Sequence, residues 1–171
     1  MVEVIRNQYS LAYRLLRFFA NLLAGGVLAQ AIGCISAYAS MNDSQAAGML
    51  AHLIMQHLAY YFFGCGFAIL SLANILIKRG ISSLKSIRLP SLVLMLTVAL
   101  ANFLLIPRMD YLLETALLDG MPVMLSPLAH YFEILNFLLL LLVLAQIISS
   151  ALIAWRLSAL QSSQVDSHGS N

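Results

Sequence analysis

The stretch that decides the fold is SPLAHYFEILNFLLLLLVLAQ, residues 126–146. After Asn136 it is almost entirely apolar, and the apolar run continues to Trp155. A helix needs about 20 such residues to cross the roughly 30 Å hydrocarbon core of a bilayer. His130, Glu133 and Asn136 stand at its beginning, although polar side chains are costly where they face lipid. The stretch therefore predicts a membrane-spanning helix with a polar first turn or two.

The composition of the whole chain agrees with a membrane protein. Of the 171 residues, 61% are hydrophobic and only 9% are charged, whereas soluble domains carry about 25% charged residues. A net charge of +2 gives no reason to expect a nucleic-acid partner, so the lipid bilayer is the expected surrounding. Cys34 and Cys65 stand in no metal-binding or disulfide pattern, and we expect them to pack as small hydrophobes, with no cofactor.

Three further stretches are long and apolar enough to cross a bilayer. The four predicted spans are residues 15–39, 52–77, 89–106 and 130–155. They predict an all-α, polytopic membrane protein built as a four-transmembrane-helix bundle. We expect one membrane domain, 15–155, between an N-terminal arm, 1–14, and a polar tail, 156–171, which is expected to be disordered.

The first span has some features of a signal peptide. Basic residues precede it, and Ala37-Tyr38-Ala39 resembles a cleavage site. Its apolar region is about twice the usual length for a signal peptide, however, and it contains Asn21 and Gln30. We therefore expect the span to be retained.

The basic residues predict the orientation of the bundle. They gather in the N-terminal arm, in the loop between the second and third spans, and in the tail (Arg6, Arg14, Arg17, Lys78, Arg79, Lys85, Arg88, Arg156). The loop at 40–51 has none, and the connection at 107–129 has only Arg108. By the positive-inside rule both termini are predicted to be cytoplasmic. The compact loops favour a bacterial protein, hence the inner membrane.

The connection at 107–129 is predicted to contain an amphipathic helix. Its apolar residues recur at helical spacing, and its charged residues take the opposite side. The apolar set is Met109, Leu112, Leu113, Ala116 and Leu117. This helix is expected to extend the third span past a kink at Pro107, and Ser126-Pro127 to begin the fourth span.

A stripe of small residues follows one side of the first span. Gly25, Ala29, Gly33 and Ala37 recur every four residues, which allows close approach of another helix backbone in lipid. The stripe is expected to pack within the monomer, and a homodimer contact is the alternative.

Several polar residues fall at a similar depth near the outer ends of the spans. Counted along the helices at about 1.5 Å per residue, they predict a polar layer that Gln30 could approach from the first span. The candidate residues are His57, Asn102, Arg108, His130, Glu133 and Asn136.

The histidines raise the question of a haem or metal site, because neutral imidazole ligates both. His52 and His57 are five residues apart and therefore point about 140° away from each other on a helix. At most one of them can join His130. A bis-histidine haem held by His57 and His130 is the alternative left open, but no motif supports it.

The order of features in three spans resembles a known family. The segments are HLAYYFFGCGFAILSLANILI at 57–77, LANFLLIPRM at 100–109 and AHYFEILN at 129–136. They are similar to the transmembrane protein 205-like family, small bacterial four-span proteins among them, which share a domain of unknown function. The resemblance covers about residues 18–155, and the chain departs from it at Glu133 and Ile134. It implies a four-helix bundle with no established catalytic activity.

No Ser/His/Asp grouping, Gly-rich phosphate loop or pair of carboxylates in the sequence suggests catalysis. The central part of every span also lacks acidic and basic residues, which a proton or ion path normally needs. The function expected is that of a non-enzymatic scaffold or accessory subunit, which associates with another membrane protein or with itself. The alternative is a small transporter, or a haem- or metal-binding electron carrier, that uses the polar layer.

Overall fold

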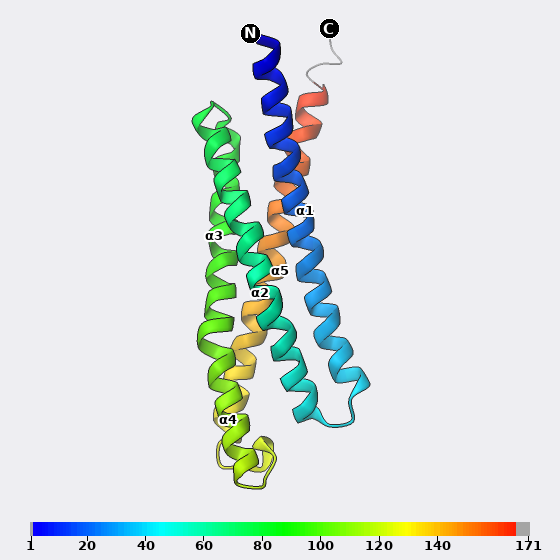
Figure 1. Ribbon diagram of the computed structural model, residues 1–171, viewed down its shortest axis with the longest axis vertical. Helices are drawn as coiled ribbons and strands as arrows, with labels where there is room; N and C mark the ends of the chain where they lie inside the picture. The colour runs from blue at the N-terminus through cyan, green and yellow to red at the C-terminus, as the bar shows by residue number, and fades with distance from the viewer. Residues whose placement is uncertain (1, 167–171) are drawn as a thin grey trace.

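Four long helical columns lie side by side in the computed structural model (Figure 1). The structure describes the backbone of residues 2–166 and the side chains of residues 11–159. The helices are α1 (Val2–Ser40), α2 (Ser44–Lys78), α3 (Lys85–Ala99), α4 (Ile106–Leu118) and α5 (Ala129–Asp166). The shorter helical segments are η1 (Ser82–Leu84), η2 (Leu100–Leu105) and η3 (Val123–Leu125). The segments from η1 to α4 stack end to end and make up the third column.

All four columns are long and apolar enough to cross a membrane. The qualifying segments are Leu11–Ser40, Ser44–Lys78, Ser82–Leu118 and Ala129–Ala159. The prediction of an all-α bundle of four candidate spans is therefore confirmed. Each segment is longer than predicted, because the polar residues that flank a span remain helical.

The third column changes its helical form before Pro107. Proline has no backbone N–H, and its ring would collide with the carbonyl group four residues earlier in a regular α-helix. The chain avoids this collision with η2, a π-helical segment in which the Ile106 N–H donates to the Ala101 carbonyl oxygen. The disturbance predicted at Pro107 thus takes the form of a wider helical turn.

The amphipathic helix predicted after Pro107 is α4. Met109, Leu112, Leu113 and Ala116 are buried as expected. Leu117 is 52% exposed, so its assignment to the apolar side was wrong. It lies about 100° around the helix from Ala116, at the outer edge of the buried side.

Both ends of the chain are more helical than predicted. α1 begins at Val2, so the arm at 1–14 continues the first span. α5 runs to Asp166, and the predicted disorder of 156–171 is wrong up to that residue. The reason is that no glycine or proline interrupts the sequence between Arg156 and Asp166. Residues 167–171 lie outside the described residues.

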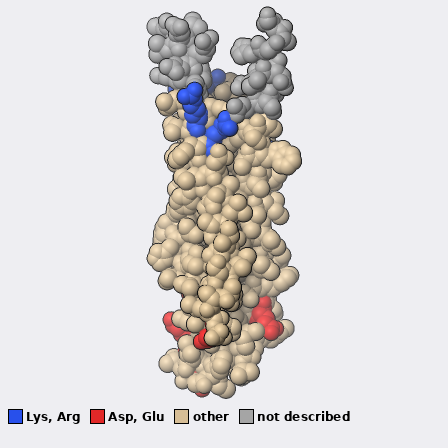
Figure 2. All heavy atoms as spheres, turned by 90° about the vertical axis from the view of Figure 1, so that its right-hand side faces the viewer, with Lys and Arg blue, Asp and Glu red and all other residues tan. Residues whose placement is uncertain are grey.

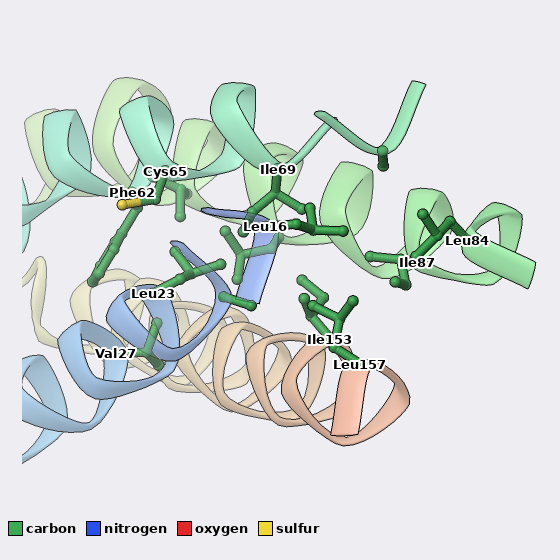
Figure 3. Close-up of a cluster of buried hydrophobic side chains, with 14 of the residues drawn as sticks. Leu16, Leu23, Val27, Phe62, Cys65, Ile69, Leu84, Ile87, Ile153 and Leu157 are labelled. Carbon is green, nitrogen blue, oxygen red and sulfur yellow. The ribbon is translucent and has the colours of Figure 1, made fainter. Parts of the chain in front are cut away.

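The interior of the bundle consists of two apolar clusters, one in each half. The half that contains the termini is filled by all four columns, with Leu23, Phe62, Ile69, Ile87 and Ile153 among its buried side chains (Figure 3). The buried residues of the other half come from α2, η2, α4, η3 and α5. α1 diverges from α5 in that half (Figure 1), and it adds only Cys34, at the edge of the cluster.

The two ends of the bundle carry opposite charges (Figure 2). Among residues 11–159, every lysine and arginine except Arg108 lies at the end that holds the termini, here called the basic end. The acidic side chains lie toward the other end, the acidic end: Asp43, Asp110, Glu114, Asp119 and Glu133. At 1.5 Å per residue, the helical length from Arg88 to Asp110 is about 33 Å, and the length from Glu133 to Arg156 is about 35 Å. Both lengths match the thickness of a bilayer core.

The small-residue stripe on α1 does not pack as predicted along its whole length. Ala37 is buried, and a Cβ atom on Gly33 would lie 3.6 Å from Ile54. Gly25 and Ala29 are exposed, so the expectation of packing within the monomer is wrong for these two. The close approach between α1 and α2 occurs at Gly26 instead, where a Cβ atom would lie 2.6 Å from Cε1 of Tyr61.

Candidate functional site

The centre of the candidate site is a hydrogen-bonded pair of side chains, His52 on α2 and Asp110 on α4. Nδ1 of His52 lies 2.7 Å from Oδ1 of Asp110, and the side-chain amide of Gln56 donates to Oδ2 of Asp110 at 3.3 Å. His52 is 4% exposed. His52 and Gln56 are four residues apart and share one side of α2, so one carboxylate on α4 accepts from both.

The position of this cluster explains why the bundle tolerates it. The side chain of Asp110 is 34% exposed and lies at the acidic end. The charge is therefore near the membrane boundary, where its cost is lower than at the bilayer centre. The pair joins α4 to α2, and it fixes how the end of the third column sits on the bundle.

Two predicted members of the polar layer meet on the other side of α2. His57 and Asn102 line a cavity of about 320 Å³ together with Gln56, Tyr60 and Phe103. Nδ1 of His57 pairs with the Leu53 carbonyl oxygen of its own helix at 2.8 Å. Nδ2 of Asn102 donates to the Val98 carbonyl oxygen at 2.9 Å, whereas its buried Oδ1 has no hydrogen-bond partner among the described residues.

The predicted members on α4 and α5 lie apart from this group. Arg108, His130 and Glu133 are all exposed. Asn136 is also exposed, and it lines two cavities. One is about 630 Å³ and lies under the loops of the acidic end. The other is about 450 Å³ and lies between α1, α2 and α5, with His52 in its wall.

Gln30 does not approach the polar layer as predicted. Its side-chain amide donates to Oε1 of Gln146 at 3.4 Å, and both residues are buried. This hydrogen bond joins α1 to α5 and satisfies two amides that would otherwise face an apolar interior. Its role is the packing of the bundle.

A bis-histidine haem is not favoured by this arrangement. The cavity that His57 lines takes its walls from α2, η2 and no part of α5, whereas His130 belongs to α5. Among the side chains of residues 11–159, no three His, Cys, Asp or Glu residues are grouped so that they could hold a metal ion. The two predicted ligands therefore do not share a site.

Comparisons with known proteins assign no family to the chain. No family model matches it. A search of curated proteins finds no relative, and a search of solved structures finds no similar fold. The resemblance to the transmembrane protein 205-like family, which rests on the segments at 57–77, 100–109 and 129–136, stays a prediction.

Sequence reasoning missed the central cluster, although a signal for it was present. His52 and Gln56 stand at i and i+4 on α2, which places two polar side chains on one side of an otherwise apolar helix. Asp110 was assigned to the solvent side of the amphipathic helix, but it follows the buried Met109 at the edge of the apolar side. A polar residue at that edge could have been tested as a partner for His52.

Proposed function

We propose that the protein is a non-enzymatic membrane scaffold or accessory subunit, which acts by helix association with another membrane protein or with a second copy of itself. The observation that supports this is the outer surface of α1. Only 22% of the most apolar window of its candidate span is buried inside the bundle, and Gly25 and Ala29 are exposed on it.

Small residues on a lipid-exposed surface favour association for a physical reason. Lipid tails are as apolar as leucine, so helices in a bilayer gain little from apolar burial and associate where their backbones approach closely. A Cβ atom built on Gly25 meets nothing within 4 Å. The bundle itself leaves this surface open, and a helix of a partner could approach there.

The proposed location is the inner membrane of a bacterium, with both termini in the cytoplasm. The separation of charge supports the orientation, because basic residues are retained on the cytoplasmic side. Both termini and the loop that joins α2 to α3 lie at the basic end (Figure 1). The loops that contain Asp43 and Asp119 lie at the acidic end and are placed outside.

Photo-cross-linking tests the proposed association. A benzophenone amino acid in place of Leu28, which is 56% exposed beside the small residues, is expected to give a cross-linked species in native membranes. Gly25→Leu in the same chain is expected to lower the yield about tenfold, a loss of roughly 1.4 kcal/mol in association free energy. The leucine would hold the partner backbone away without touching the interior of the bundle.

The matched control carries the benzophenone in place of Tyr60, which is 76% exposed on α2. It is expected to give no comparable species. A linked product of twice the chain mass would identify self-association, and a different mass a second protein. Equal yields from positions 28 and 60, or a yield at 28 that Gly25→Leu leaves unchanged, would contradict the proposal.

A further inference from the structure

The cavity between α1, α2 and α5 has an apolar body and a polar end. Its volume is about 450 Å³, within the range of sites that hold small molecules. The α5 residues in its wall run from Asn136 to Ile147, a length of about 16 Å along the helix. His52 and Asn136 stand at the end nearer the acidic end of the bundle, and the rest of the wall is mainly aliphatic.

His52 brings a buried ring nitrogen to the wall of this cavity. The side chain of His52 is 5% exposed, and its Nδ1 lies 2.7 Å from the Asp110 carboxylate. An ionised carboxylate only accepts, so Nδ1 carries the hydrogen, and Nε2 is the ring nitrogen that Asp110 leaves free for a second hydrogen bond. The structure gives Nε2 no partner among the residues it describes.

The chemistry of the wall selects the kind of molecule that fits. No aspartate, glutamate, lysine or arginine lines the cavity, so nothing there would balance a charged head group. A hydroxyl group both donates and accepts, so it can form a hydrogen bond with Nε2 of His52 while the amide of Asn136 contacts its oxygen. An apolar chain attached to that hydroxyl would follow Leu139, Val143 and Ile147 along α5.

We infer that this cavity is a binding site for an uncharged amphiphile with a single apolar chain, such as a fatty or isoprenoid alcohol, whose hydroxyl group forms a hydrogen bond with Nε2 of His52. The site is formed by the cavity, the buried His52–Asp110 pair and Asn136. It is independent of the association proposed for the outer surface of α1.

A cysteine already present in the wall can report occupancy. Cys34 lines the cavity, and its thiol lies 3.9 Å from the Ala51 carbonyl oxygen. The other cysteine, Cys65, belongs to the apolar cluster of the opposite half (Figure 3). In a Cys65→Ala protein, alkylation by N-ethylmaleimide therefore measures access to the cavity alone.

The test compares two probes that differ by one hydroxyl group. Full-length Cys65→Ala protein in lipid nanodiscs is treated with N-ethylmaleimide in the presence of 1-dodecanol or of dodecane. We expect dodecanol to slow the alkylation of Cys34 severalfold and dodecane to leave it unchanged at the same concentration. Asn136→Leu, which leaves the His52–Asp110 pair intact, is expected to raise the dodecanol concentration needed for half-protection about tenfold. His52→Leu is expected to abolish the difference between the two probes.

Two results would overturn the inference. Equal protection by dodecane and dodecanol would mean that any apolar chain, including that of a phospholipid, fills the cavity without recognition of a head group. Unchanged protection by dodecanol in the folded Asn136→Leu protein would remove the polar end from the site.

Discussion

Gly26→Leu is expected to cause the largest loss of stability of any single substitution in α1. A Cβ atom at this position would lie 2.6 Å from Cε1 of Tyr61 and 3.0 Å from Cε1 of Phe62. The Tyr61 ring cannot simply turn away, because its hydroxyl donates to the Leu22 carbonyl oxygen at 2.7 Å. The leucine must therefore separate α1 from α2 or break that hydrogen bond.

Overpacking of this kind costs about 3 kcal/mol or more. For a chain of this length, that loss corresponds to a fall of roughly 6–12 °C in melting temperature, measured in mild detergent by the temperature at which the protein aggregates. The control is Gly64→Leu, since a Cβ atom on Gly64 meets nothing within 4 Å. Similar melting temperatures for the two variants would show that α1 and α2 do not pack closely at Gly26.

Removal of the Asp110 carboxylate is expected to have the second-largest effect. Asp110→Ala leaves the His52 ring buried without its partner and frees the amide of Gln56. Hydrogen bonds to charged groups contribute about 1.5–3 kcal/mol, and a buried polar group left unpaired costs a similar amount. We expect a loss of about 2 kcal/mol in the free energy of unfolding, measured by denaturant titration in detergent.

Asp119→Ala is the matched control, since Asp119 is exposed at the end of the same helix. The double replacement His52→Leu with Asp110→Leu is expected to be less destabilising than Asp110→Ala, because it removes both polar partners from the contact. If Asp110→Ala were no more destabilising than Asp119→Ala, the pair would contribute nothing to the joining of α2 and α4.

The number and order of the candidate spans could be read from the sequence because the bilayer imposes them. Runs of about 20 apolar residues have one stable form in lipid, a helix that satisfies its own backbone groups. The charged residues that bound these runs are separated by about one bilayer thickness, as in the interval from Arg156 to Glu133. The amphipathic pattern of α4 could be read in the same way, since its outer side leaves the apolar region.

The rotation of each helix about its own axis could not be predicted from the sequence. A helix in a bilayer is apolar both toward lipid and toward its neighbours, so the pattern that orients a helix in water is weak. Both main corrections are errors of rotation. The stripe that begins at Gly25 was placed inward, whereas the close contact is at Gly26, about 100° around the helix. His52, which was left out of the predicted polar layer, carries the buried pair with Asp110.

Pairings between residues far apart in the chain could not be predicted from the sequence either. His52 and Asp110 are 58 residues apart, and Gln30 and Gln146 are 116 apart. Each of these residues has an acceptable position near an interface or within a bundle, and only the packing of the columns decides which two meet. The partner of each polar residue was therefore not predictable from the sequence.

We propose that four helices cross one membrane, with the basic end in the cytoplasm. Labelling of single cysteines in intact cells tests it most directly. Cys34 and Cys65 are replaced by alanine in the full chain. Asn42→Cys, Ser83→Cys and Asp119→Cys are then introduced one at a time at exposed loop positions.

A membrane-impermeant maleimide is expected to label positions 42 and 119 in intact cells, and position 83 only after the membrane is permeabilised. Labelling of position 83 alone would reverse the orientation. Labelling of 42 and 119 from opposite sides of the membrane would contradict the four-span bundle itself.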